Sequence, residues 1–199
     1  LTQRIDPRPK LLFVDKDRGA EIFIRALGGQ YETLVPGEPT GFNPLSLPDT
    51  APNREFLYQL FGFMLRPAPS GELSASEEQV IRNAIAASLG SGPEGRTLQA
   101  FSTLLRGRIR AGEGDLLARL ESWMRPDQRG WLFNNDKDQF SLSSIFGFDM
   151  TRVLDDPVIR TAALMYIFHR MEELLIGDPV MIFLDEGWRL LDDEVFAFF

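Results

Sequence analysis

The sequence contains no cysteine, one histidine and three lysines. Without cysteine the chain can form neither disulfides nor thiolate metal sites. A single histidine, His169, gives little support to a hydrolase triad or a histidine-based zinc site, and it is expected to be structural. None of the lysines, Lys10, Lys16 and Lys137, follows a glycine. The chain therefore lacks the G-x-x-x-x-G-K-[ST] phosphate loop of many nucleotide-binding proteins.

Long hydrophobic runs and excess positive charge are missing as well. No apolar stretch reaches about 18 residues without a charge, and the first residues do not form a signal peptide, so neither a membrane span nor an export signal is expected. The net charge is −8, and residues 171–199 hold eight acids and one base, which is −7 of it. This balance argues against non-specific binding of nucleic acid or anionic lipid as the main activity. The start without Met and the end in Phe-Ala-Phe-Phe indicate a piece of a longer protein.

The first 50 residues follow a strand, helix, strand pattern. The apolar run Lys10–Asp15 predicts a strand, and the helical spacing of apolar residues in 18–28 predicts a helix that ends at Gly28-Gly29. Alternation over Tyr31–Val35 predicts a second strand. Residues 36–44 are too rich in Pro and Gly to be anything but a loop.

Beyond residue 51 the pattern becomes helical and then mixed again. Helices are expected at 53–66, 74–89, 97–108 and 113–124, the second of them opened by a Ser74/Glu77 capping box. Strands are expected at 131–133 and 144–150, followed by an almost wholly apolar, buried helix at 158–176. The plan is an α/β core formed by residues 1–50 and 131–199, split by an all-helical insertion at 51–130.

The most informative segment is Val180-Met-Ile-Phe-Leu-Asp185-Glu186, a continuous apolar run that ends in two acids. Such a run is typical of a strand buried on both faces in a parallel sheet. The pattern resembles a Walker B element, in which the first acid holds Mg²⁺, usually through water, and the second orients the water that attacks the γ-phosphate. A core strand that ends at an acidic helix cap has the same pattern, so the segment alone leaves both interpretations open.

Three other segments invite a functional interpretation. Residues 90–97 have the spacing of a phosphate loop with Arg96 in place of Lys, but they follow a helix and contain Pro93 and Glu94, so a turn between helices is favoured. The basic run at 106–110 is interpreted as a solvated helix end. The charged residues 15–19 follow a strand, where ligand sites form in α/β proteins, although a helix cap explains them equally well.

Four ordered motifs together resemble one family. They are Phe13-Val-Asp15-Lys-Asp-Arg18-Gly-Ala-Glu21, Pro36-Gly-Glu-Pro-Thr-Gly-Phe-Asn-Pro-Leu45, Gly147-Phe-Asp-Met-Thr151 and Phe183-Leu-Asp-Glu-Gly-Trp-Arg-Leu-Leu191. Their order is similar to that in the C-terminal ATPase domain of the VirB-type energising ATPases of type IV secretion systems, the CagE/TrbE/TraC group. The resemblance spans nearly the whole chain. It implies a RecA-like P-loop NTPase core, present in part, with an all-helical insertion.

The resemblance also implies a function for the intact protein. It would be a Mg²⁺-dependent ATPase that works as an oligomer, often a hexamer, with other inner-membrane secretion components at the cytoplasmic face of the bacterial inner membrane. Its hydrolysis would power pilus assembly and the transfer of a protein or nucleoprotein substrate, as in conjugation. The phosphate loop would lie before Leu1, so the chain by itself is expected neither to bind nor to hydrolyse ATP appreciably.

Residue roles follow from the same resemblance. Asp185 matches the Mg²⁺-linked acid and Glu186 the catalytic glutamate. Asp15 and Arg18 match a charged loop near the nucleotide or a neighbouring subunit, and with Asp185 they are the residues expected to bind the nucleotide and its metal. The arginine that acts across a subunit boundary is not fixed, with Arg18, Arg106 and Arg108 all candidates.

Two alternatives remain. One is a HerA/FtsK-like or conjugative coupling ATPase that translocates DNA, which would need a basic channel that this acidic chain does not offer outside 106–110. The other is a non-catalytic docking module that retains the motif.

Overall fold

The structure is a computed structural model, and it describes residues 9–67, 71–106, 116–141, 143–173 and 179–185. The chain divides into two compact units. Residues 1–35 and 141–199 form the first, called here the sheet unit, and residues 36–140 form the second, called here the helical unit. Among the described residues, no helix is both long and apolar enough to cross a membrane.

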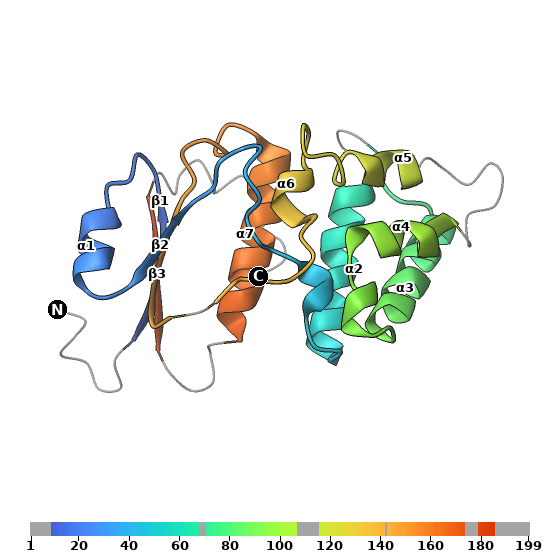
Figure 1. The fold of residues 1–199 in the computed structure, drawn as a ribbon, viewed down its shortest axis with the longest axis horizontal. Helices are drawn as coiled ribbons and strands as arrows, with labels where there is room; N and C mark the ends of the chain where they lie inside the picture. The colour runs from blue at the N-terminus through green and yellow to red at the C-terminus, as the bar shows by residue number, and fades with distance from the viewer. Residues whose placement is uncertain (1–8, 68–70, 107–115, 142, 174–178, 186–199) are drawn as a thin grey trace. The chain divides into compact units, whose positions relative to one another are not determined.

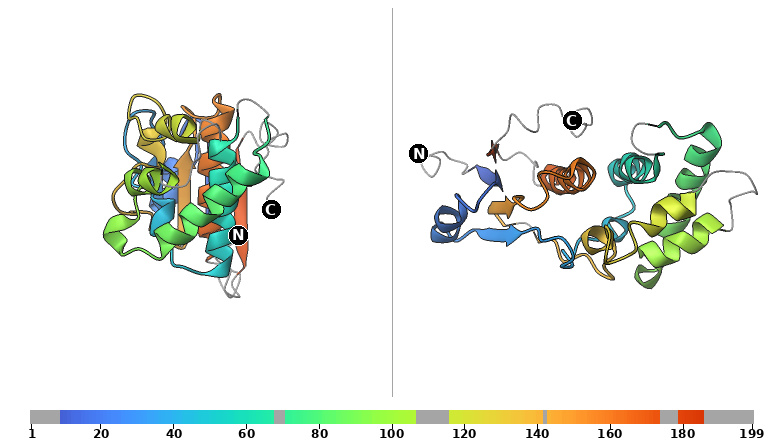
Figure 2. Two further views of the ribbon diagram at one scale, coloured as in Figure 1. Left: turned by 90° about the vertical axis from the view of Figure 1, so that its right-hand side faces the viewer. Right: turned by 90° about the horizontal axis from the view of Figure 1, so that it is seen from above.

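The sheet unit is a parallel sheet with a helix on each face. In chain order its elements are β1 (Lys10–Asp15), α1 (Glu21–Ala26), β2 (Gln30–Thr33), β3 (Ile145–Asp149), α7 (Pro157–Glu172) and β4 (Val180–Leu184). The strand order is β2-β3-β1-β4, and all three pairings are parallel. In the right-hand view of Figure 2, which looks down from above, α1 and α7 lie on opposite sides of the strands. The α/β core predicted from the sequence is confirmed.

The face of the sheet under α1 is packed tightly at β3. A Cβ atom added at Gly147 would lie 2.4 Å from the Ile24 side chain and 2.5 Å from the Tyr31 ring. One strand further along, Phe13 stacks on Phe183 of β4 and contacts Phe23 of α1 edge-on. Gly147 is therefore the place where only a hydrogen atom fits between β3, α1 and β2.

The opposite face of the sheet carries the more completely buried side chains. Because side chains alternate along a strand, Leu12 and Val14 of β1 and Phe148 of β3 point away from α1, and all three are buried. Figure 1 shows α7 on this side of the sheet. Helix α7 is buried along nearly its whole length, as its continuous apolar sequence predicts. Asp156 caps its first turn by accepting hydrogen bonds from the backbone N–H groups of Val158 and Ile159.

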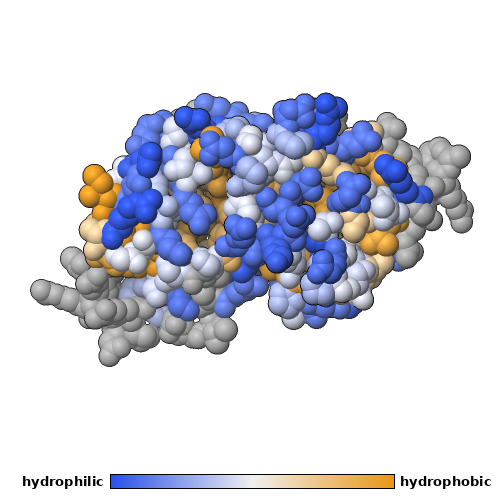
Figure 3. All heavy atoms as spheres, viewed as in Figure 1, coloured by the Kyte–Doolittle hydropathy of each residue, from blue (hydrophilic) through white to orange (hydrophobic). Residues whose placement is uncertain are grey.

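The expectation that Val180–Leu184 is buried on both faces is wrong for the chain as described. Strand β4 pairs only with β1 among the described strands, so it lies at the edge of the sheet. Met181, Ile182 and Phe183 are 36–50% exposed. Helix α1 has six residues and lies over β2 and β3, too short and too far across the sheet to cover β4. Further apolar surface is exposed at the α1 end of the unit (Figure 3), where Ile22 is 84% exposed.

The described residues of the helical unit form helices, turns and irregular segments, and no strand. Its helices are α2 (Ala51–Leu65), α3 (Ala75–Leu89), α4 (Leu98–Arg106), α5 (Leu116–Glu121) and α6 (Gly130–Phe133), with short 3-10 turns η2 (Pro44–Ser46) and η3 (Pro93–Gly95). The predicted capping box opens α3, with Ser74 and Glu77 each accepting from the other's backbone N–H. The core is aromatic: Phe61 packs on Phe101, and the buried Trp123 indole donates to the Met64 carbonyl at 3.0 Å.

The helical unit is longer than the insertion predicted at 51–130. Residues 36–50 belong to it because Thr40 N–H donates to the Trp131 carbonyl, and the buried Asn43 bonds both Asp138 and the Arg96 carbonyl. The unit boundaries therefore lie at Val35 and Ser141. A loop rich in Pro and Gly carries no periodicity, so its sequence does not indicate which unit it joins.

The strand predicted at 131–133 is also wrong, because these residues form the short helix α6. Trp131 donates from its indole to the Gln128 carbonyl, within the same turn. A Cβ at Gly130 would lie 2.7 Å from the Met124 backbone, so the chain passes close to itself at the start of the helix. Three consecutive apolar residues have no period that separates helix from strand, and burial in a helical unit decides between them.

His169 is a structural residue of α7, as expected. It is 6% exposed, and burial, followed by the charge of Arg170, lowers its pKa to about 4. The Glu172 carboxylate, 3.6 Å from Nδ1, acts in the opposite direction, but it is half exposed and screened, so burial dominates.

Because the folded state holds His169 neutral, an unfolded chain binds a proton more readily below its ordinary pKa of about 6.5. We expect the unfolding free energy of the 199-residue chain to fall by up to about 3 kcal/mol from this group as pH decreases from about 6.5 to 4. Urea titrations of wild type and His169→Gln across this range measure it, since carboxylate titrations are common to both. Equal pH slopes in the two proteins would contradict the assignment.

Candidate functional site

Three aspartates lie at the carboxyl ends of neighbouring parallel strands. Asp15 ends β1 and is paired in register with Asp149, which ends β3. Asp185 follows β4, and its backbone N–H donates to the Val14 carbonyl at 2.8 Å. The carboxyl edge of a parallel α/β sheet is where ligand sites form. Three segments that are distant in sequence thus bring their acids to the same end of the sheet, where the strands have their carboxyl ends: 11–15, 145–149 and 180–185.

Asp15 is engaged within the protein. It is buried, and its Oδ2 accepts hydrogen bonds from the Tyr31 hydroxyl at 2.5 Å and the Ala20 backbone N–H at 2.9 Å. Burial, then the hydrogen bond to Asp15 and its negative charge, raise the pKa of Tyr31 well above its ordinary value, so this hydroxyl stays protonated and remains a donor. Asp15 therefore connects the end of β1 to the start of α1 and to β2.

The loop between β1 and α1 has an unusual backbone. Asp17 and Arg18 adopt left-handed conformations, with φ of 58° and 59°. For residues with a Cβ atom this conformation costs about 1–2 kcal/mol each. The Arg18 side chain is more than half exposed and pairs with Glu21, which also pairs with Arg25. These two arginines lower the pKa of the Glu21 carboxyl, with the hydrogen bond from Arg25 as the largest cause.

Asp149 and Thr151, which lie in one of the four family-like motifs but to which the sequence assigns no role, hold this loop. Thr151 donates from its hydroxyl and its backbone N–H to the Asp149 carboxylate, the latter at 2.9 Å. The same hydroxyl oxygen accepts from the Asp17 N–H at 2.7 Å. In addition, the Met150 N–H donates to the Asp15 carbonyl at 2.9 Å. An acid directly after an apolar strand, the signal that marked Asp185, also marks Asp149 and could have identified it.

Asp185 is the described residue best placed to hold a metal ion. It is exposed at the end of β4, whereas Asp15 and Asp149 are buried. The described residues hold no group of three or more His, Asp or Glu side chains that could bind a metal by themselves. One exposed carboxylate fits Mg²⁺, which keeps several waters and is held by one or two carboxylates together with substrate phosphates. Glu186, Trp188 and Arg108 lie outside the described residues.

The segment 90–97, which has the spacing of a phosphate loop, forms the connection between two helices. Residues 90–97 connect α3 to α4 through η3. The Arg96 guanidinium donates to the carbonyls of Leu89, Ser91 and Leu47, two of which belong to the end of α3 or follow it. Arg96 thereby satisfies carbonyl groups that a helix end leaves unpaired. The expected turn between helices is confirmed.

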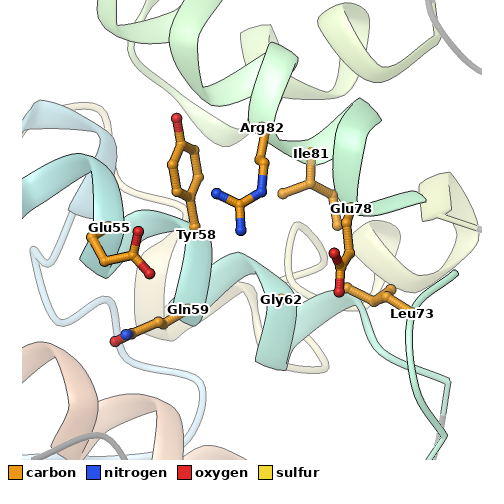
Figure 4. Close-up of a pocket in the computed structure, with 8 residues that line it drawn as sticks. All are labelled: Glu55, Tyr58, Gln59, Gly62, Leu73, Glu78, Ile81 and Arg82. Carbon is orange, nitrogen blue, oxygen red and sulfur yellow. The ribbon is translucent and has the colours of Figure 1, made fainter. Parts of the chain in front are cut away.

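A cavity of about 120 Å³ lies in the helical unit, between α2 and α3. Figure 4 shows the side chains that surround it. The Arg82 guanidinium lies over the Tyr58 ring, 4.6 Å from its centroid, and Glu55 and Glu78 flank the opening. None of the three strand-end aspartates, Asp15, Asp149 and Asp185, lines this cavity. Its size suits a side chain rather than a nucleotide, so it is not a candidate for a nucleotide site.

Solved structures define the class of fold. The chain is similar to the structure of VirB4 of Thermoanaerobacter pseudethanolicus, with a TM-score of 0.71 and 17% sequence identity over 94% of this chain and 55% of that one. The parallel sheet and its flanking helices therefore form part of a RecA-like P-loop fold, as the sequence predicts. No protein-family model matches the chain.

Curated relatives define the family. The chain is 38% identical over 202 residues to the type IV secretion system protein VirB4 of Bartonella henselae, and 39% identical over 198 residues to PtlC of Bordetella pertussis. These matches cover 100% and 94% of this chain, and 25% and 24% of the relatives. The chain belongs to the VirB4/PtlC family of type IV secretion proteins, which confirms the resemblance. It spans about a quarter of the length of these relatives.

Proposed function

We propose that the whole protein hydrolyses ATP with Mg²⁺ to energise type IV secretion, both pilus assembly and substrate transfer. The observation that carries this proposal is the position of Asp185, exposed at the carboxyl end of a parallel strand beside two other strand-end aspartates. Relatives that are type IV secretion proteins support the biological setting. The chemistry of Mg²⁺ when bound is to neutralise charge that develops on the phosphates.

The proposal assigns a role to each candidate site residue. Asp185 holds Mg²⁺ through water, and Glu186 orients the attacking water and accepts its proton. Arg18, at the exposed surface of the β1–α1 loop, contacts nucleotide phosphates or a neighbouring subunit. The interpretation of Asp15 as a nucleotide-contacting residue stays a prediction, and its hydrogen bonds to Tyr31 and Ala20 favour a role in shaping the loop.

The assembly and location are proposals as well. The whole protein would work as an oligomer, in the manner of hexameric RecA-like motors, peripheral to the cytoplasmic face of the inner membrane. Its partners would be other secretion components at that membrane, and the transported protein or nucleoprotein would contact it indirectly. Direct DNA binding is not part of the proposal, because the chain carries a net charge of −8.

Phosphate release from ATP tests this function. We expect Mg²⁺-dependent turnover by the purified whole protein and its loss on chelation of the metal, because the charge on the phosphates is then no longer neutralised. The 199-residue chain, which has no phosphate loop, should release no phosphate above buffer. Turnover that survives chelation, or turnover by the isolated chain, would contradict the proposal.

A further inference from the structure

A continuous chain of hydrogen bonds runs from the end of β3 to the loop beside Asp185. The Asp149 carboxylate orients the Thr151 hydroxyl by accepting a hydrogen bond from it, and this leaves a lone pair of the hydroxyl oxygen aimed at the Asp17 N–H, 2.7 Å away. Asp149 is 3% exposed, so water competes little for its carboxylate. Asp17 and Arg18 are the two left-handed residues of the loop.

The Thr151 contact acts where the loop is under strain. Residue 17 needs a partner for its N–H, because a left-handed backbone at a residue with a Cβ persists only when surrounding contacts fix it. On the other side of the loop, Ala20 N–H is held by Asp15. The turn that carries Arg18 is therefore fixed at both ends, by Thr151 just beyond β3 and by Asp15 at the end of β1.

We propose that Thr151 is a positioning residue for the nucleotide site, acting through the Asp17–Arg18 turn. This inference rests on the proposed function and deepens it. Thr151 does not contact the reacting atoms. Its hydroxyl sets the backbone of the turn, and the turn sets where the Arg18 guanidinium lies relative to Asp185, whose backbone is hydrogen-bonded to the residue before Asp15. Displacing a charged group in a site by about 1 Å can slow a reaction by about 100-fold.

The test uses the whole protein, with ATP and Mg²⁺ as the probe. Thr151→Val keeps the shape of the side chain and removes the hydroxyl, so we expect kcat/KM to fall at least about tenfold. Thr151→Ser retains the hydroxyl and should restore most of the activity. Thr103→Val is the matched control, because the Thr103 hydroxyl bonds only the Ala100 carbonyl on the exposed side of α4. Thr151→Ala, which adds no methyl group, repeats the test should the valine not be accommodated.

A double-mutant cycle separates positioning from general stability. If Thr151 acts through Arg18, then Thr151→Val should change kcat/KM by less than about threefold in an Arg18→Ala background. Hydrogen exchange gives a second readout: the Asp17 amide should exchange at least about tenfold faster in Thr151→Val and at the wild-type rate in Arg18→Ala.

Each outcome decides a separate point. Faster exchange at Asp17 with unchanged kcat/KM in Thr151→Val would overturn the inference and leave the proposed function intact. An equal loss of kcat/KM in the presence and absence of Arg18 would also overturn it, since Thr151 would then act by another route. Absence of ATP hydrolysis in the wild-type whole protein would overturn the proposed function itself, and the inference with it.

Discussion

Glu186→Gln in the whole protein should lower kcat for ATP hydrolysis by at least about 100-fold while ATP still binds. Glutamine keeps the size of the side chain but cannot accept a proton from the attacking water. In the proposed mechanism Glu186 does not hold the phosphates, so the dissociation constant of ATP should change by less than about threefold. Phosphate release gives kcat, and equilibrium binding of a fluorescent ATP analogue in the presence of Mg²⁺ gives the affinity.

The design of this experiment includes two comparisons. Glu38→Gln makes the same chemical change at an exposed loop position of the helical unit and should leave kcat unchanged. Asp185→Asn should differ from Glu186→Gln by weakening the Mg²⁺ dependence as well as the rate, because Asp185 is the proposed Mg²⁺-linked acid. If Glu186→Gln turns over at the wild-type rate, Glu186 is not the base.

Gly147→Ala should destabilise the sheet unit by about 2–3 kcal/mol, at the upper end of the usual cost of overpacking. The added methyl would lie 2.4 Å from Ile24 and 2.5 Å from the Tyr31 ring. Neither neighbour can move easily, since Ile24 is fully buried and the Tyr31 hydroxyl is hydrogen-bonded to Asp15. Urea unfolding of the 199-residue chain, followed by circular dichroism, measures the change.

Gly19→Ala is the matched control in the same unit. A Cβ at Gly19 would lie 3.7 Å from Asp15 Oδ1, an ordinary van der Waals distance, so this variant should remain within about 1 kcal/mol of wild type. If both alanine variants are equally destabilised, loss of glycine rather than the clash with Ile24 and Tyr31 is responsible.

The sequence predicts the helices and strands well where it carries a strong local signal. The bounds of β1 and β4 and the start of α3 agree with the structure, because continuous apolar runs and a capping box are local signals. The sequence predicts a strand at 131–133, where the structure has the helix α6, because three apolar residues carry no period. The exposed position of β4 was missed because strand composition does not record how many neighbours a strand has in the described sheet.

The candidate site shows the same division between local and non-local information. Asp185 and Asp15 could be singled out, since each directly follows an apolar strand. The role of Thr151 could not, because its partner Asp17 is 134 residues away in the sequence. Likewise, Tyr31 belongs to an alternating strand pattern, and nothing in that pattern indicates that its hydroxyl meets Asp15.

The pairing order of the sheet has a consequence for synthesis on the ribosome. Strands β1 and β2 do not pair with each other, and each of them pairs with β3. In the sequence, β1 and β3 are separated by the whole helical unit, although Leu11 pairs in register with Ile145. At about 5–20 residues per second, β1 emerges roughly 7–27 s before β3 does. The helical unit is one contiguous segment, residues 36–140, and can fold before β3 emerges. The apolar strand β1 remains unpaired throughout, which makes nascent chains of this length natural clients for a chaperone.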